Sequence, residues 1–368
     1  MDEKNNGLQT SPERDLESPL AATEKSRWER TWPALACGAG LFSDGYLQAV
    51  IGPVNTILGK LYPNSYATSA AAQNVSSIAF AGTVVGQLVF GYTSDHYSRK
   101  WSLLVSTGIL VLFAALSAGS YGAGGSHQGL FAALTAFRFL LGIGIGGEYP
   151  AGSVGCAEAS GELKVGHRNR WFCLFTNTQI DLGFVIGTLV PMIITAARPH
   201  DLGLVWRLSL GLGVIPPLSL LYLRLNLKEP ESVSREAFRH GPGDNIGLVA
   251  SKTCATGIRG QYYAIAAATG KIGAFVGGYV FPVIEADGGG ADTLHGGQYP
   301  FYVASALCFF SAFLVFWLPQ INQDTIQTED VRFREYLVAN GYDITGMGSA
   351  EWQEKRAMSV GGGHDASS

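Results

Sequence analysis

Long apolar stretches recur along the whole chain, and they constrain its fold more than any other feature. Eight of them are about 20 residues long or longer: 33–58, 69–91, 101–121, 129–150, 171–196, 204–224, 260–284 and 299–319. A hydrocarbon core about 30 Å thick needs roughly 20 apolar residues per helix. Only 15% of the 368 residues are charged, against about 25% in soluble domains. We therefore predict an all-α polytopic membrane protein with about eight transmembrane helices.

Polar segments between the stretches divide the chain into five parts. These are a disordered cytoplasmic tail at 1–31, a six-helix half at 32–225, a cytoplasmic connection at 226–259, two helices at 260–320 and a cytoplasmic tail at 321–368, with a short amphipathic helix around Arg332. Basic residues gather in the loops of one side, including Arg99, Lys100, Arg168 and Arg224, while the other side has Lys60 and Arg198. Because positive loops stay in the cytoplasm, we expect both termini there.

Several function classes are disfavoured by composition and spacing. A net charge of −4 gives no electrostatic basis for a nucleic-acid partner. The five cysteines form no CxxC pair, so no zinc site is indicated. No Ser/His/Asp constellation is visible either. We therefore expect neither an enzyme, nor a metal, nor a bound cofactor.

Four charged residues interrupt the apolar spans: Asp44, Glu148, Asp181 and Lys271. A charge inside a membrane costs roughly 2.5–3.5 kcal/mol on insertion scales and usually faces a cavity or a partner. Three acids and one base indicate a proton-linked path beside a contact for an anion. The alternative is a set of buried ion pairs, for example between Lys271 and one of the acids.

A glycine-rich run, Gly142 to Gly147, lies in the fourth span. It resembles a dinucleotide-binding loop only superficially, because that motif needs a preceding strand in a βαβ unit. Gly142 and Gly146 are four residues apart, the spacing at which small residues let membrane helices approach closely. Arg138 precedes the run by one turn, and it either orders the inner cavity wall or extends to the interface.

The loop between the second and third spans carries a second pattern. Gly91 permits close approach of two helices, and Asp95 has the position to cap a helix or to pair with a base. The alternative is an ordinary basic loop, in which Arg99 and Lys100 only set the topology.

These motifs resemble those of the major facilitator superfamily. Gly91, Asp95, Arg99 and Lys100 match its cytoplasmic signature G-x-x-x-D-[RK]-x-G-[RK]-[RK], with His96 and Ser98 as departures. The segment from Arg138 to Pro150 resembles the fourth-span signature of the phosphate–proton symporter branch, and 228–232 resembles its PES motif. Within that branch the chain is most similar to the fungal glycerophosphoinositol permeases, notably over 139–150, 168–172 and 181–187.

The resemblance implies a proton-coupled importer of glycerophosphodiesters such as glycerophosphoinositol, or of phosphate, in the plasma membrane. It assigns proton coupling to Asp44 and Glu148, and substrate contact to Glu148, Tyr149, Lys271 and Asp181. It assigns conformational roles to the motif residues Gly91, Asp95, Arg99, Lys100, Arg138, Gly142 and Gly146. A proton gradient replaces any cofactor, and the expected partners of a monomeric transporter are the lipid bilayer and a small anionic organophosphate.

The same resemblance indicates that part of the fold is missing. The superfamily has twelve helices in two halves, whereas Gly241-Pro242-Gly243 resembles the middle of span ten and follows the PES region directly. We therefore predict a truncated major facilitator fold, with spans one to six and eleven to twelve. The alternatives are a transport-inactive membrane protein, mis-spliced or regulatory, and an inorganic phosphate or sugar porter.

Overall fold

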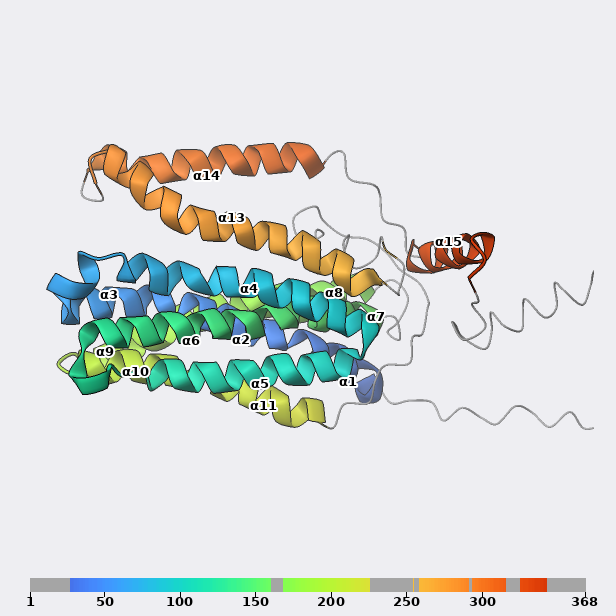
Figure 1. Cartoon of the computed structure of the whole chain (residues 1–368), viewed down its shortest axis with the longest axis horizontal. Coiled ribbons are helices and arrows are strands. Elements are labelled where there is room, and N and C mark those ends of the chain that lie inside the picture. The colour runs from blue at the N-terminus through green and yellow to red at the C-terminus, as the bar shows by residue number, and fades with distance from the viewer. Residues whose placement is uncertain are drawn as a thin grey trace, which may run out of the picture.

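Helices make up all the regular structure in the part of the chain that the computed structural model describes, namely residues 27–159, 168–225, 254, 258–290, 293–315 and 325–342. In order, the α-helices are α1 (Arg27–Gly38), α2 (Gly40–Ala49), α3 (Ile51–Leu61), α4 (Ala71–His96), α5 (Arg99–Ala118), α6 (His127–Gly147), α7 (Val154–Ala159), α8 (Arg168–Phe175), α9 (Asn177–Ala197), α10 (Leu202–Leu212), α11 (Ile215–Leu225), α13 (Arg259–Asp287), α14 (Leu294–Val315) and α15 (Thr325–Ala339). Figure 1 shows their arrangement. The prediction of an all-α protein is confirmed.

Within the described residues, seven helical segments are long and apolar enough to cross a membrane: Ala34–Leu61, Ala71–His96, Arg99–Ala118, His127–Ala157, Trp171–Ala197, Leu202–Leu225 and Arg259–Asp287. Each overlaps one of the first seven predicted spans. The fourth continues beyond the predicted end at residue 150, through a π-helical turn, Glu148–Ser153, into α7. The eighth predicted span overlaps α14, and its residues 316–319 lie outside the described residues.

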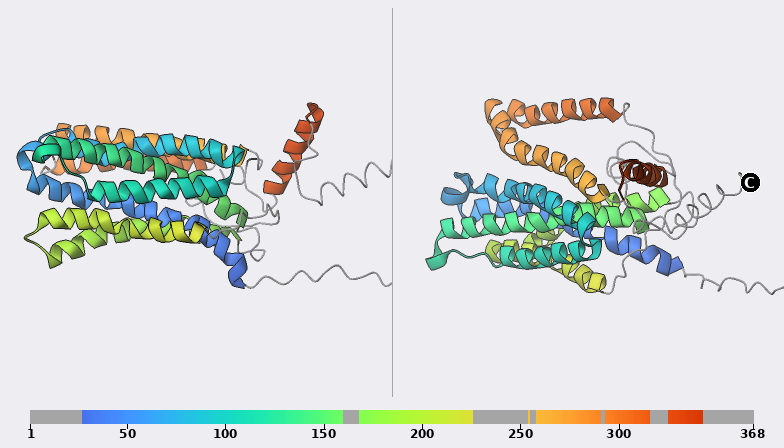
Figure 2. Two further views of the ribbon diagram at one scale, coloured as in Figure 1. Left: turned by 60° about the horizontal axis from the view of Figure 1, so that its bottom comes forward. Right: turned by 45° about the vertical axis from the view of Figure 1, so that its right-hand side comes forward.

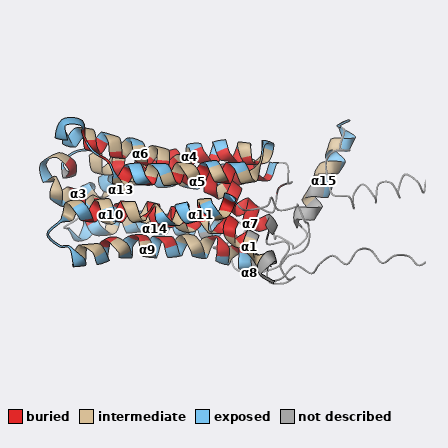
Figure 3. Cartoon of the chain, turned by 90° about the horizontal axis from the view of Figure 1, so that it is seen from below, coloured by how far each residue is buried: buried red, intermediate tan, exposed pale blue. Residues whose placement is uncertain are grey.

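The first six spans pack into one bundle around an apolar core. Figure 3 shows buried residues along the inward sides of the helices and exposed residues along their outer sides. Trp206, Tyr46 and Leu134 are among the buried residues of the largest core cluster. A second cluster, which includes Cys37, Ala157 and Phe172, joins α1, α7 and α8. Buried side chains thus fill the interior of the bundle along its length, and the second cluster covers the end where α1, α7 and α8 lie.

Helices α13 and α14 form an antiparallel hairpin beside this bundle, with α13 packed on α4 (Figures 1 and 2). Their outward faces are apolar, and Phe309 of α14 is 79% exposed. Met192 on α9 is 62% exposed in the same way. Exposed apolar surface of this extent suits contact with lipid tails.

Side-chain caps define where several spans begin. Ser98 accepts a hydrogen bond from the Trp101 backbone N–H at 3.3 Å, at the start of α5. Asp201 accepts one from the Leu204 backbone N–H at 3.0 Å, at the start of α10. These caps satisfy backbone groups that a helix leaves unpaired at its first turn.

The polar parts of the chain agree with the predicted division only in places. Helix α1 begins at Arg27, inside the tail predicted to end at residue 31, and residues 1–26 lie outside the described residues. A helix is present at the place predicted near Arg332, namely α15. The segment 226–253, with the proposed remnant of span ten, also lies outside the described residues.

Candidate functional site

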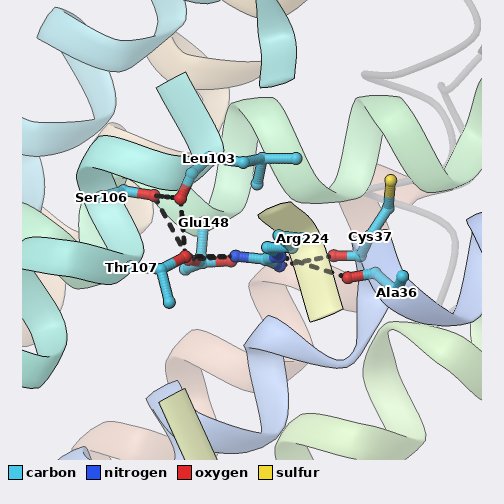
Figure 4. A network of polar contacts seen from close by, with 7 residues as sticks. All are labelled: Ala36, Cys37, Leu103, Ser106, Thr107, Glu148 and Arg224. Atoms are coloured by element: carbon cyan, nitrogen blue, oxygen red, sulfur yellow. Dashed lines mark hydrogen bonds and ion pairs between the residues drawn. The ribbon is translucent and has the colours of Figure 1, made fainter. Parts of the chain in front are cut away.

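A buried ion pair joins Glu148 of the fourth span to Arg224 of the sixth span (Figure 4). Arg224 Nη1 donates to Glu148 Oε1 at 2.6 Å, and the two side chains are 1% and 0% exposed. Thr107 and Ser106 of α5 donate their hydroxyls to the same carboxylate oxygen at 2.9 and 3.2 Å. A carboxylate with a cation and two hydroxyls around it is well stabilised in a medium of low dielectric constant.

Arg224 also binds the backbone of the first span. Its Nε and Nη2 atoms donate to the carbonyl oxygens of Ala36 and Cys37 at 3.3 and 3.2 Å. One guanidinium therefore joins α1, α11 and the turn that begins at Glu148. This corrects the sequence prediction, which counted Arg224 among the residues of a cytoplasmic loop, because the residue lies inside α11 and is buried.

Local backbone geometry makes room for this pair. Glu148 opens the π-helical turn Glu148–Ser153, a wider form of helix that often occurs at functional sites. Gly40 of α2 lies directly against the pair, since a Cβ atom there would overlap Glu148 Oε2. The close approach of α2 therefore depends on a residue without a side chain at position 40.

One face of α2 leads from this pair toward Lys271. Gly40, Asp44 and Gln48 are four residues apart, so they follow one another along the same side of the helix. Asp44 is fully buried, and neither of its carboxylate oxygens has a hydrogen-bond partner among the described residues. Glu148 Oε2 also lacks a partner there. Such unsatisfied buried groups need an explanation, and protons or a ligand supply one.

Lys271 of α13 lies at the other end of this row. Its Nζ atom donates to Gln48 Oε1 at 3.2 Å. The ammonium also lies 5.0 Å from the ring centre of Tyr149 and 5.7 Å from that of Phe80, within the range of a cation–π contact. The structure thus brings together two predicted substrate contacts, Tyr149 and Lys271, which are far apart in the sequence.

The alternative interpretation, an ion pair between Lys271 and one of the acids, does not describe this arrangement. The partner of Lys271 is the neutral amide of Gln48, while Glu148 pairs with Arg224. Asp181 is exposed on α9 and lies outside the buried cluster. Its predicted contact with substrate stays a prediction.

The motif between the second and third spans holds α13 against α4. Asp95 accepts hydrogen bonds from the backbone N–H groups of Gly260 and Gln261 at 3.0 and 2.8 Å. Its negative charge lies at the first turn of α13, where the helix dipole favours an anion. Gly91 permits the contact, because a Cβ atom there would overlap Ala264. Both expectations for this pair, a cap and a close helix approach, are confirmed.

The two basic residues of that motif lie in the first turn of α5. Arg99 Nη2 lies 4.0 Å from Asp95 Oδ1, at the limit of an ion pair. Lys100 is half-buried in the first turn of α5. Their predicted conformational role stays a prediction.

Arg138 is buried in the middle of the bundle, so the interpretation as a side chain that extends to the interface is wrong. It is 1% exposed, and its Nε donates to the Val75 carbonyl at 2.7 Å. Its Nη1 donates to the Leu47 carbonyl at 3.4 Å. Arg138 therefore joins α6 to α4 and to the first span.

The glycine run packs α6 against α4, as its spacing predicts. Cβ atoms at Gly142 and Gly146 would overlap the carbonyl oxygens of Ala79 and Thr83. In return, Gly82 and Gly86 of α4 lie against the α6 backbone. Because the run is helical throughout, it forms no nucleotide-binding loop.

Gln48 and Arg224 are among the contributors to the site that were not predicted from the sequence. Gln48 is uncharged, so a search for charged residues within the spans does not find it. Its position four residues after Asp44 nevertheless places it on the same helix face. Arg224 ends an apolar stretch, where a base is usually taken for the start of a loop. The pairing of each residue depends on a helix far away in the sequence.

A bundle of membrane-crossing helices with buried charges in its interior is typical of a multi-pass membrane protein, and comparison with known proteins gives its class. The chain belongs to the sugar (and other) transporter family, whose sequence pattern matches residues 33–234. This match covers all six membrane spans of the first bundle.

The relatives of the chain include two yeast permeases from Candida albicans. The glycerophosphocholine permease GIT4 is 36% identical and aligned over 94% of this chain and 90% of its own length. The major glycerophosphoinositol permease GIT3 is also 36% identical, over 86% of this chain and 84% of its own. The partially occluded, inward-open structure of the xylose transporter XylE from E. coli has a TM-score of 0.45 and 18% identity, covering 70% of this chain and 62% of that one.

The alignment with GIT4 also shows a deficit in this chain. It extends over 480 positions, whereas the chain has 368 residues. At least 112 aligned positions of that relative therefore have no counterpart here. A deficit of this size is comparable to several membrane spans of about 20 residues with their loops.

Proposed function

We propose that this transporter is a proton-coupled symporter that imports glycerophosphodiesters across the plasma membrane. The named substrates of GIT4 and GIT3 support this choice, because both are glycerophosphodiesters. The basic loops on one side of the bundle support a topology with both termini in the cytoplasm. Inorganic phosphate is the alternative substrate, and competition against a labelled glycerophosphodiester distinguishes the two.

The observation that carries the proposal is the ammonium of Lys271, which lies half-buried between α13 and the first bundle. A cation among membrane helices is costly and marks a path for an anion or for a counter-ion. Its hydrogen-bond partner, Gln48 Oε1, carries no charge, so the positive charge of Lys271 is not neutralised by this contact. A phosphodiester anion neutralises it.

Proton coupling is supported by the position of Asp44. Its carboxyl group is buried without a hydrogen-bond partner among the described residues. An ionised carboxylate in that position is costly, so the neutral acid is favoured until a cation or water reaches it. Asp44 lies one helical turn from Gln48, the partner of Lys271. A proton on Asp44 and an anion at Lys271 thus stabilise each other electrostatically.

Replacement of Asp44 with asparagine tests this coupling. We expect Asp44→Asn to keep exchange of labelled for unlabelled glycerophosphodiester across vesicles, because the anion contact at Lys271 remains. Accumulation driven by a pH gradient should fall to the level of empty vesicles, because asparagine carries no exchangeable proton at this position. Both are measured as uptake of labelled glycerophosphoglycerol into proteoliposomes.

The matched control is Asp287→Asn, which neutralises an exposed acid at the end of α13. It should accumulate substrate as the wild type does. Gradient-driven accumulation by Asp44→Asn at the wild-type level contradicts proton coupling through Asp44.

A second candidate is a membrane protein of this family that does not transport. The deficit of at least 112 aligned positions favours it, because alternating access in this fold requires one half to move against the other. Such a protein binds the substrate anion at Lys271 without moving it. Binding by the purified chain, together with the absence of both exchange and accumulation, identifies this candidate.

A further inference from the structure

The cationic side chains inside the protein differ in their partners and in their burial. This difference bears on which anion the site accepts. Arg224 is paired with Glu148. Arg138 donates to the carbonyl oxygens of Val75 and Leu47. Arg259 donates to the carbonyl oxygen of Cys254 at 3.2 Å. These three side chains are at most 1% exposed and hold helices or turns together.

Lys271 is different because it is not fully buried, so its uncompensated charge is accessible to an anion. It is half-buried, and its hydrogen-bond partner is an amide oxygen. The rings of Tyr149 and Phe80 flank the ammonium and limit its access to water. In the described part of the chain, no carboxylate lies within ion-pair distance of Lys271. With Asp44 neutral and Glu148 paired, the site offers one net positive charge.

The amide of Gln48 has a second function in this geometry. Its Oε1 atom accepts from Lys271, so its Nε2 atom is the remaining polar group. Nε2 is buried and has no acceptor among the described residues. Buried donors of this kind are normally paired. An anion that reaches Lys271 can supply the missing acceptor. The ammonium binds one atom of the Gln48 amide and Nε2 is the other, so both donors lie close together.

We propose that Gln48 is a specificity-determining residue. Its neutral amide oxygen positions Lys271 without compensating the positive charge, and its Nε2 donates a hydrogen bond to a second oxygen of the substrate. The site then selects a phosphodiester, which carries one negative charge, over a phosphomonoester or inorganic phosphate in its dianionic form. A dianion leaves one negative charge uncompensated in a medium of low dielectric constant, which is costly. This inference rests on the proposed function and adds to it the residue and the charge rule that choose the substrate.

Ligand binding to the purified full chain in detergent tests the rule without any transport step. Bound ligand raises the unfolding temperature in proportion to its affinity, so a thermal titration gives each dissociation constant. The probes are glycerophosphoglycerol, a monoanion at pH 5 and at pH 7.5, and glycerol 3-phosphate, whose second ionisation lies near pH 6. We expect glycerol 3-phosphate to bind about tenfold more weakly at pH 7.5 than at pH 5, while the diester changes within about twofold.

Variants of Gln48 separate the amide from the rest of the site. Gln48→Glu neutralises Lys271 and should weaken binding of both probes by about tenfold or more. Gln48→Lys adds a second charge and should reverse the preference in favour of glycerol 3-phosphate at pH 7.5. Gln48→Leu removes both polar atoms and should weaken diester binding. This variant provides the test if the charged variants do not fold. The unfolding temperature without ligand shows which variants fold.

The control is Gln298→Glu, the same substitution on α14, where Gln298 accepts a hydrogen bond from Tyr302 at 3.1 Å. It should bind both probes like the wild type. Wild-type affinities from Gln48→Leu, or an unchanged preference in Gln48→Lys, overturn the inference and leave the proposed function intact. A wild-type chain that binds glycerol 3-phosphate but no diester overturns both.

Discussion

Arg224→Met is expected to lower the free energy of unfolding by about 3–5 kcal/mol, the cost of leaving a buried charge without its partner. The substitution removes the only cation bonded to Glu148 among the described residues, and with it the contacts to Ala36 and Cys37. The carboxylate of Glu148 then remains buried with hydroxyl donors alone. Unfolding of the purified protein by denaturant in detergent micelles measures the change.

The double variant Arg224→Met with Glu148→Leu distinguishes a lost ion pair from lost packing. Replacement of a whole buried pair by apolar residues of similar size is often neutral or stabilising. We therefore expect the double variant to recover most of the stability lost in Arg224→Met. If Arg224→Met alone unfolds like the wild type, the pair does not hold these helices together.

Lys271→Met should lower the uptake of glycerophosphodiester by about a hundredfold. The methionine keeps much of the length of the side chain and its contact with Tyr149 and Phe80, but it removes the charge. Loss of one member of a buried, charged contact typically costs 2–5 kcal/mol or more, and about 2.7 kcal/mol corresponds to a hundredfold change. Initial rates of uptake into proteoliposomes at equal protein content measure it.

Lys60→Met is the matched control, since Lys60 is an exposed lysine in the last turn of α3. It should transport at the wild-type rate. Uptake by Lys271→Met within a few-fold of the wild type would place the anion elsewhere in the bundle.

The architecture of the first bundle could be predicted from the sequence because the bilayer imposes a simple length rule. Apolar stretches of about 20 residues specify helices wherever they occur, and small residues four apart specify close packing. Gly142 and Gly146 illustrate this, since both lie against α4 as their spacing indicates. Such features are local and need no knowledge of the partner helix.

The partners within the site could not be predicted in the same way. Glu148 and Arg224 are separated by 76 residues and meet through the packing of α11 against α5 and α2. Lys271 and Gln48 are separated by 223 residues. The sequence indicates that buried charges need partners, but it does not indicate which base goes to which acid. In the absence of this information, pairing Lys271 with an acid was the natural alternative.

The exact ends of the spans also could not be predicted from the sequence. A charge at the edge of an apolar stretch is read as a loop residue, which misplaced Arg224. A long side chain in the last turn of a helix, as Arg224 is in α11, can extend back into the bundle and pair with a buried acid. Span boundaries from hydropathy alone therefore conceal residues of this kind.

Gradient-driven uptake by the full 368-residue chain tests most directly whether it transports glycerophosphodiesters with protons. Proteoliposomes loaded at pH 7.5 and diluted into pH 5.5 receive labelled glycerophosphoglycerol. The account predicts accumulation above the external concentration, which collapses with a protonophore and is suppressed by excess unlabelled diester more than by phosphate. If protein that is folded and binds the diester gives no more uptake than empty vesicles, the account is contradicted and the non-transporting candidate stands.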